Sequence, residues 1–146
     1  MAQRVTHSPA DITRRVLIDI GVGGDPPSTP WPIYATSEPD LPDNLITVFD
    51  VIGSSDGRSM IDGEVLSHFG IQIRVRSTTH QIGWQKADEI QTALAKEIYQ
   101  RTISIEGNTY YVHCFARIQD VLAIGFDLPN RRSFFVVNAN VSLRQL

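Results

Sequence analysis

Apolar and polar residues alternate from Phe69 to Arg76, and this segment is the centre of the predicted fold. A period of two places successive side chains on opposite faces of a β-strand. The apolar face carries Phe69, Ile71, Ile73 and Val75. The opposite face carries Gln72, Arg74 and Arg76. The segment therefore predicts a strand with one buried face and one polar face.

After this strand the spacing of the apolar residues becomes helical. Thr78 is the predicted N-cap, and Gln81 three residues later completes a capping box. The apolar residues that follow recur at spacings of three and four: Trp84, Ala87, Ile90, Leu94 and Ile98. This stripe predicts an amphipathic helix, which forms the core-building unit together with the strand.

A second helix is predicted near the N-terminus. Ser8 can cap it, Pro9 suits its first position, and Asp11 completes the capping box. Its apolar stripe consists of Ile12, Val16, Leu17 and Ile20. Gly21 predicts its end. Because so short a helix is marginal alone, it must dock on another element.

Proline dominates the following segment, residues 22–44. Each proline removes a backbone donor, so the segment predicts neither a helix nor a central strand. Trp31 and Tyr34 lie in its middle and have apolar bodies to bury. The segment is interpreted as a loop that Trp31 pins across the sheet, or as an arm that binds a partner. A polyproline ligand for a signalling module is a third interpretation.

The other apolar segments predict strands joined by turns. Strands are expected over residues 45–50, 101–105, 109–119, 121–128 and 132–143, with a weaker segment at 60–66. Consecutive strands joined by tight turns pair antiparallel. We therefore predict an α+β fold: a single domain with a mostly antiparallel or mixed sheet of four to six strands and two main helices packed on one face.

The last predicted strand is apolar on both faces over its first half. Phe134 and Val136 lie on one face, and Phe135 and Val137 lie on the other. A strand of this kind is normally covered on both sides. A helix or another protein is expected to lie over it.

Length and composition limit the class of protein. The 146 residues suit one domain over residues 1–146 with a substantial core. The formal net charge of -3 argues against a dedicated nucleic-acid binder, which is normally basic. Cys114 is the only cysteine, so the chain has no intramolecular disulfide and is compatible with a reducing cytoplasm. No apolar run approaches the roughly 18 residues of a membrane span.

The residues that usually carry chemistry do not form a motif. The histidines are scattered, without a pair at metal-ligand spacing: His7, His68, His80 and His113. His113 and Cys114 are neighbours in a predicted strand, so their side chains are expected on opposite faces. We expect no catalytic residue, no metal site and no cofactor. A small enzyme that uses His113 or Asp62 is kept as an alternative.

The charges of most interest are four arginines: Arg74, Arg76, Arg131 and Arg132. The first two share one strand face, and the last two adjoin a predicted turn. They are interpreted either as solvated groups or as an interface set that pairs with carboxylates of a neighbouring subunit. The planar guanidinium group suits bidentate contacts of that kind.

Taken together, these segments resemble the tail terminator proteins of long-tailed bacteriophages, also called tail completion or minor capsid proteins. The resemblance starts at Trp31 and rests on the order of WPIY…EPDLPDN, ITVFD with its DGR turn, FGIQIRVRS before a helix, a short hairpin, and LAIGFDLPNRRSFFVVNANV. It implies a mixed sheet flanked by helices, with no enzymatic activity.

The resemblance also implies an assembly. The expected form is a homohexameric ring at the head-proximal end of a siphophage-type tail, which caps the tail tube and joins tail to head. The expected partners are copies of the chain, the tail tube protein and a head-completion or connector protein. Genomic DNA would pass through the lumen without sequence-specific binding. The expected location is the virion, after assembly in the host cytoplasm, with no membrane contact.

The segments that match the family supply the interface candidates: Gln72, Arg74, Arg76, Asp127, Asn130, Arg131, Arg132, Trp31 and Tyr34. Within the structural proteins, a head-completion adaptor bound to the connector is the alternative. A peptide-binding module that uses the 22–44 segment is a further one.

Overall fold

The computed structural model describes residues 5–26, 31–40, 42–58, 65–96, 99–117, 120–127 and 131–146. These residues form two helices and seven strands. In chain order the elements are α1 (Pro9–Asp19), β1 (Ile33–Ala35), β2 (Leu45–Arg58), β3 (Val65–Ser77), α2 (His80–Lys96), β4 (Tyr99–Ile105), β5 (Asn108–Arg117), β6 (Leu122–Asp127) and β7 (Arg132–Gln145). The predicted α+β class is confirmed. The short β1 inside the proline-rich segment raises the strand number above the expected four to six.

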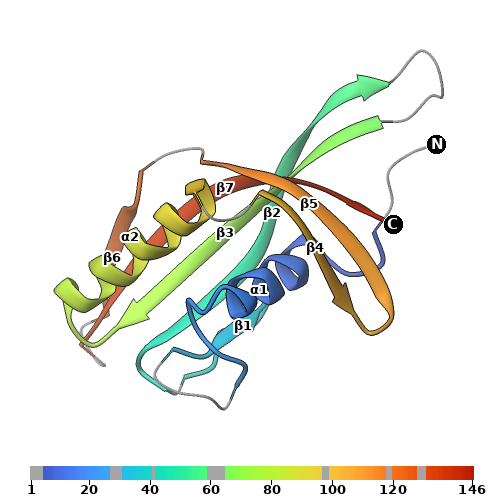
Figure 1. Ribbon diagram of the computed structural model, residues 1–146. Helices are drawn as coiled ribbons and strands as arrows, with labels where there is room; N and C mark the ends of the chain where they lie inside the picture. The colour runs from blue at the N-terminus through green and yellow to red at the C-terminus, as the bar shows by residue number, and fades with distance from the viewer. Residues whose placement is uncertain are drawn as a thin grey trace.

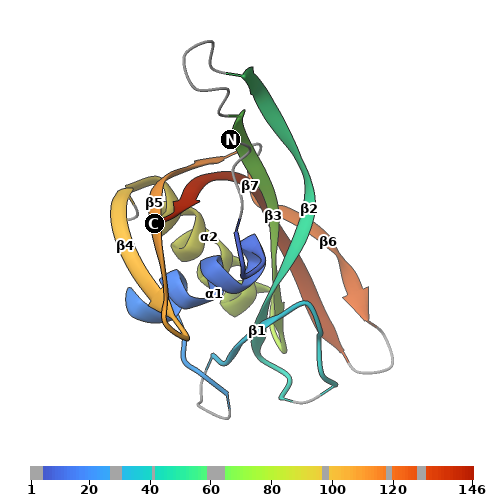
Figure 2. The same ribbon diagram turned by 90° about the vertical axis from the view of Figure 1, so that its right-hand side faces the viewer.

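One curled sheet contains all the described strands (Figure 1). Its order is β1-β2-β3-β7-β5-β4, and β6 pairs with the first part of β7. Every pairing is antiparallel except that of β1 with β2. Both helices lie inside the curl of the sheet (Figure 2). The mixed sheet with helices on one face therefore agrees with the sequence prediction.

The central strands β3 and β7 give the sheet a buried inner face and a polar outer face. Their register places Ile73 opposite Val137, and both side chains are fully buried against the helices. On the outer face Gln72 lies opposite Asn138, and their side chains form a hydrogen bond of 3.3 Å. The alternation read from the sequence thus matches the two faces of the sheet.

The first half of β7 is covered on both sides, as predicted. On the inner face Phe135 is buried beneath α2, and the Trp84 ring packs against it with the centroids 6.3 Å apart. On the outer face Val136 is buried. Its neighbour Phe134 lies under the guanidinium group of Arg74, whose Cζ is 4.8 Å from the ring centroid. A helix supplies the inner cover, and side chains of the same chain contribute to the outer one.

α1 begins as the sequence predicts. Ser8 is the N-cap, its Oγ accepts a hydrogen bond from the backbone N–H of Asp11, and Pro9 opens the helix. The buried side chains of the predicted stripe are Ile12, Val16 and Leu17. The helix ends before Gly21, whose φ of 85° favours glycine. α1 docks on β1 and β2, which supplies the burial that a short helix requires.

α2 differs from its prediction in two details. The N-cap is Thr79 and not Thr78, because the Thr79 Oγ1 accepts a backbone hydrogen bond in the first turn. The exposed fraction of Trp84 is 42%, and Gly83 faces the sheet in its place. A Cβ atom on Gly83 would lie 2.6 Å from the ring of Phe135. Glycine therefore lets the helix approach the sheet closely, which the apolar stripe could not reveal.

β2 and β3 extend beyond the rest of the sheet as a two-stranded projection (Figure 1). It comprises residues 51–58 of β2 and 65–68 of β3, with its base at Val51, which lies opposite Gly70 where β7 joins the sheet, and we call it the β2 arm. Beyond this base and within the described residues, the two strands pair only with each other, and the side chain of His68 forms a hydrogen bond of 2.8 Å with that of Ser142 in β7. The arm therefore presents open strand edges to its surroundings.

The described parts of the proline-rich segment 22–44 lie along the edge of the sheet at β1 and against its outer face at Glu38, Asp40 and Asp43. Trp31 packs against the core, with the Nζ of Lys86 5.2 Å from its ring centroid. The short β1 adds an edge strand to β2, a position that tolerates neighbouring prolines. Trp31 therefore packs on the fold, but beside α2 at the edge and not across the sheet, and the role of the segment as a partner-binding arm stays a prediction.

Candidate functional site

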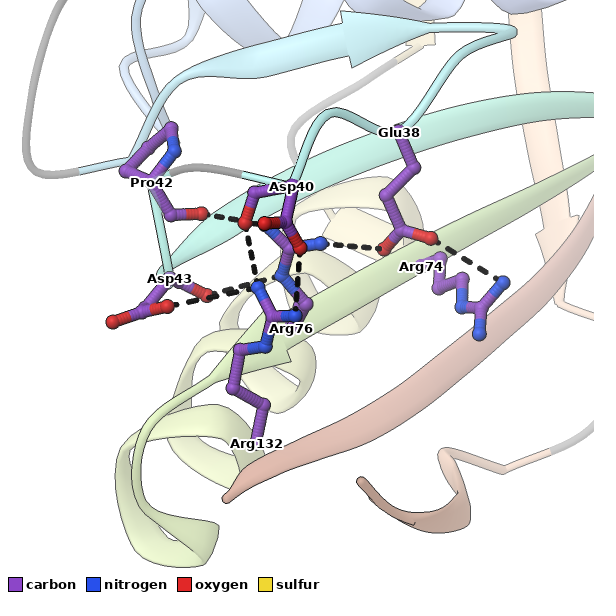
Figure 3. A network of polar contacts seen from close by, with 7 residues as sticks. All are labelled: Glu38, Asp40, Pro42, Asp43, Arg74, Arg76 and Arg132. Atoms are coloured by element: carbon purple, nitrogen blue, oxygen red, sulfur yellow. Dashed lines mark hydrogen bonds and ion pairs between the residues drawn. The ribbon is translucent and has the colours of Figure 1, made fainter. Parts of the chain in front are cut away.

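Three arginine side chains gather at one end of the outer face, and we call Arg74, Arg76 and Arg132 the arginine cluster (Figure 3). Arg74 and Arg76 are two residues apart in β3 and therefore share a face. Arg132 is the first residue of β7. It lies two residues before Phe134, which is opposite Arg76 in the antiparallel pairing of β3 with β7. The side chains of Arg76 and Arg132 are each 4% exposed. The sheet thus brings together charges that are far apart in the sequence.

Arg76 holds the segment 38–43 through its main-chain carbonyl groups. Its Nη2 donates to the carbonyl oxygens of Pro42 at 2.6 Å and Asp40 at 3.0 Å, and its Nε donates to that of Asp43 at 3.3 Å. A proline-containing segment outside helix and strand leaves such carbonyl groups without regular partners. The planar fork of a guanidinium group can supply several donors at once.

Arg132 holds the same segment from β7. Its Nη1 donates to the carbonyl oxygen of Asp40 at 2.6 Å, and its Nη2 donates to the Oδ1 of Asp40 at 3.1 Å. Its Nη1 also lies 3.6 Å from the Oδ1 of Asp43. Arg76 and Arg132 therefore meet at the carbonyl group of Asp40, which links β3, β7 and the segment.

Glu38 completes the network on the side of Arg74. One carboxylate oxygen lies 3.4 Å from the Nη1 of Arg74, and the other lies 4.0 Å from the Nη1 of Arg76. The Glu38 side chain is 16% exposed, so this pair is partly shielded from solvent. The acidic and carbonyl groups of one short segment thus face three cations.

Burial lowers the pKa of the Arg76 guanidinium group, and the positive charge of Arg132 acts in the same direction. The carboxylates of Glu38, Asp40 and Asp43 oppose this shift. Arginine keeps its charge in proteins despite such shifts. The arginine cluster is therefore a permanent set of hydrogen-bond donors and is poorly suited to proton transfer. Its geometry is suited to holding the 38–43 segment on the sheet.

The interpretation of these arginines as solvated groups is wrong for Arg76 and Arg132, which are buried. Sequence reasoning also missed their acceptors in the segment 38–43, because it looked for carboxylates on a neighbouring subunit. A signal was present: three acidic residues lie among the prolines of EPDLPD. The intermolecular role of the arginines stays a prediction, and Arg131 is the exposed member of the four.

The remaining interface candidates lie in different places. Gln72 shares the outer face with the arginine cluster. Tyr34 in β1 pairs with Thr47 of β2, and Thr47 pairs with Arg74 of β3. Because paired residues share a face of the sheet, Tyr34 also belongs to the outer face. Trp31 is separate from them and packs near α2.

The last two candidates come from the segment 127–130 of the sequence. Asp127 ends β6 and pairs through its backbone with Arg132. Asn130 lies outside the described residues, as do Ile98 of the predicted helix and Asp62 of the enzyme alternative.

Among the described residues no group of three or more histidine, cysteine or acidic side chains could hold a metal ion. His113 and Cys114 are both exposed, because a bulge between Val112 and Cys114 interrupts the alternation of β5. The prediction that their side chains lie on opposite faces assumed a regular strand, and β5 is not regular at this point.

The curled sheet and a polar site built for holding a segment fit a structural component of an assembly. A model of the bacteriophage tail terminator protein family matches residues 16–140. Because this match covers most of the chain, the protein belongs to the bacteriophage tail terminator family, a family of structural virion proteins. The family named from the sequence is thereby confirmed.

No individual curated protein matches the chain. Neither of the two described helices is long and apolar enough to cross a membrane.

Proposed function

We propose that the protein forms a ring at the head-proximal end of the tail tube, stops growth of the tube and joins the tail to the head. Family membership over residues 16–140 is the observation that carries this proposal. The ring is expected to be hexameric and the tail of the siphophage type. Its partners are further copies of the chain, the tail tube protein and a head-completion or connector protein.

The physical properties of the chain support this function. The arginine cluster ties a proline-rich segment to the sheet, which favours a rigid outer face of fixed shape. The sheet has open edges at β6 and along the β2 arm, within the described residues. Contacts between different surfaces of identical subunits close into a ring when the rotation allows it. A net charge of -3 also suits a lumen through which DNA must slide, because basic walls bind phosphates nonspecifically.

Tube capping tests the proposal. Purified protein is added to polymerising tail tube subunits of the same phage, and tube length and end density are measured by electron microscopy. We expect density at one end only and arrested growth at that end. Tubes that elongate normally and carry no added protein would contradict the proposal.

A second assay separates the tail terminator from the head-completion alternative. The protein is used as bait against the tail tube protein and the connector protein in parallel. Binding to the tube end supports the proposal, and binding to the connector alone supports a head-completion adaptor. No contact among the described residues favours the enzyme or the peptide-binding module over these two.

A further inference from the structure

Three polar atoms on the outer face of the sheet are enclosed by protein and form no hydrogen bond with the described residues. They are the Oγ1 of Thr47 in β2, the Nε of Arg74 in β3 and the Oε1 of Glu38 in the proline-rich segment. Buried polar atoms of proteins are normally hydrogen-bonded, because a polar group taken out of water loses free energy without a new partner. Three such atoms on one face therefore indicate a binding site.

The three atoms belong to residues that adjoin one another. Thr47 and Arg74 lie directly opposite each other in the antiparallel pairing of β2 with β3. Side chains of such a pair leave the sheet side by side on the same face. The Nη1 of Arg74 lies 3.4 Å from the Oε2 of Glu38, so the guanidinium and carboxylate groups are neighbours too (Figure 3). The site therefore lies where β2, β3 and the proline-rich segment meet.

The site is closed to large ligands. Thr47 has an exposed fraction of 0% although it lies on the outer face. The Cζ of Arg74 lies 4.8 Å from the ring centroid of Phe134, and the Glu38 side chain is 16% exposed. A side chain of another protein cannot reach atoms that are enclosed in this way. An occupant must be as small as one water molecule or a monatomic ion.

The chemistry of the three atoms distinguishes a water molecule from an ion. The Nε–H of Arg74 is a donor, the carboxylate oxygen of Glu38 is an acceptor, and the hydroxyl group of Thr47 can be either. An anion suits Arg74 but is repelled by Glu38, and a cation suits Glu38 but is repelled by the arginine cluster. A water molecule both donates and accepts, and buried waters typically make about three hydrogen bonds to groups of this kind.

We propose that one ordered water molecule is bound between Thr47, Arg74 and Glu38. It accepts a hydrogen bond from the Nε–H of Arg74, donates one to the Oε1 of Glu38, and forms the third with the hydroxyl group of Thr47. The water strengthens the link to the proline-rich segment where direct contacts are longest. Glu38 lies 3.4 Å and 4.0 Å from its two arginines, whereas Arg76 donates to Pro42 at 2.6 Å. This site does not depend on the proposed ring.

A high-resolution crystal structure of the full chain tests the site directly. We expect an ordered water molecule within hydrogen-bond distance of all three atoms. Crystals soaked in bromide test for an anion, because bromide replaces chloride and scatters X-rays anomalously. An anomalous peak at the site would overturn the proposal. A direct hydrogen bond from the Thr47 hydroxyl group to another protein group, in place of the water, would also overturn it.

A pair of threonine substitutions tests what the water contributes to stability. Thr47→Val keeps the shape of the side chain and removes the hydroxyl group. We expect the equilibrium constant for unfolding to rise about 5-fold, the usual effect of one lost hydrogen bond. Thr13→Val is the matched control, because the Thr13 hydroxyl group is also buried without a hydrogen bond to the described residues but lies on α1, inside the curl of the sheet. A rise for Thr47→Val no larger than that for Thr13→Val would overturn the proposal.

Magnetic relaxation dispersion of the water oxygen nuclei counts long-lived internal waters in solution. Thr47→Val is expected to lower the dispersion amplitude by the contribution of one water, because a water with only two partners exchanges faster. Thr47→Ser keeps the hydroxyl group and is expected to keep the wild-type amplitude. An amplitude that Thr47→Val leaves unchanged would overturn the proposal.

A double-mutant cycle tests whether the water connects two side chains that form no hydrogen bond with each other. If one water links Thr47 to Glu38, the effects of Thr47→Val and Glu38→Ala on the unfolding constant are coupled by at least about 2-fold. Thr13→Val combined with Glu38→Ala is the control pair and is expected to be additive. Additive effects for Thr47→Val and Glu38→Ala would overturn the proposal.

Discussion

The arginine cluster and the edge strand β6 illustrate two different uses of side chains near the surface. The cluster is charged, yet Arg76 and Arg132 are buried and bind carbonyl and carboxylate groups of their own chain. On β6 the side chains of Leu122, Ile124 and Phe126 are apolar yet exposed, and β6 pairs with one strand only within the described residues. At the first site two guanidinium groups bind several oxygen atoms of the same chain, and at the second site apolar side chains are left exposed.

This difference separates stability from association. A buried guanidinium group that serves several carbonyl groups stabilises the fold, because its removal leaves those groups without donors. A half-exposed leucine or phenylalanine adds less to folding and is available for a partner. We therefore expect substitutions in the arginine cluster to lower the free energy of unfolding more than substitutions of the exposed apolar residues of β6.

The largest effect on stability is expected from Arg76→Ala. It removes three hydrogen bonds to the 38–43 segment, and we expect a loss of about 3 kcal/mol in the free energy of unfolding. Urea unfolding followed by circular dichroism measures this. Arg131→Ala is the control, since Arg131 is exposed and its loss should cost no more than about 0.5 kcal/mol. Equal effects of the two variants would mean that the cluster does not stabilise the fold.

Gly70→Ala is expected to have the next largest effect. A Cβ atom there would lie 2.3 Å from the carbonyl oxygen of Ile52, so the strands at the base of the arm must move apart. We expect a cost of about 2 kcal/mol, typical of overpacking. Gln72→Ala, two residues along β3, is the control and should leave the arm intact. Thermal unfolding of both variants measures the difference.

Ser8→Ala is expected to cost about 1 kcal/mol, because α1 loses its N-cap. Ser8→Asp keeps a side-chain oxygen acceptor and is expected to stay near the wild-type stability. Neither change is expected to affect self-association, since α1 lies inside the curl of the sheet. A loss of assembly in Ser8→Ala at temperatures where the chain stays folded would count against the separation of the two roles.

The smallest effect on stability is expected from Ile52→Thr. The side chain is 95% exposed, so the free energy of unfolding should change by no more than about 0.5 kcal/mol. Ile73→Thr makes the same chemical change at a fully buried position of β3 and should cost about 2 kcal/mol or more. Measuring both by urea unfolding shows whether Ile52 serves the fold. A cost at Ile52 close to that at Ile73 would mean that the arm is part of the core.

Local signals in the sequence predicted much of the fold. The alternation in β3, the Ser8 cap of α1 and the hairpin turn between β4 and β5 depend on residues close together in the chain, and the structure agrees with them. Prediction was poorer where two segments must fit each other. Trp84 was assigned to the buried stripe, but the close fit of Gly83 against Phe135 decides which face of α2 meets the sheet.

The sequence by itself determined the α+β class, the family and the strand face that carries Arg74 and Arg76. Only the tertiary structure decided that Arg76 and Arg132 bind the proline-rich segment, and that Ile52 and Ile124 remain uncovered. The physical reason is that side-chain periodicity is a property of neighbouring residues. Hydrogen-bond partners and burial depend instead on the register between strands and on the path of a segment that crosses the sheet.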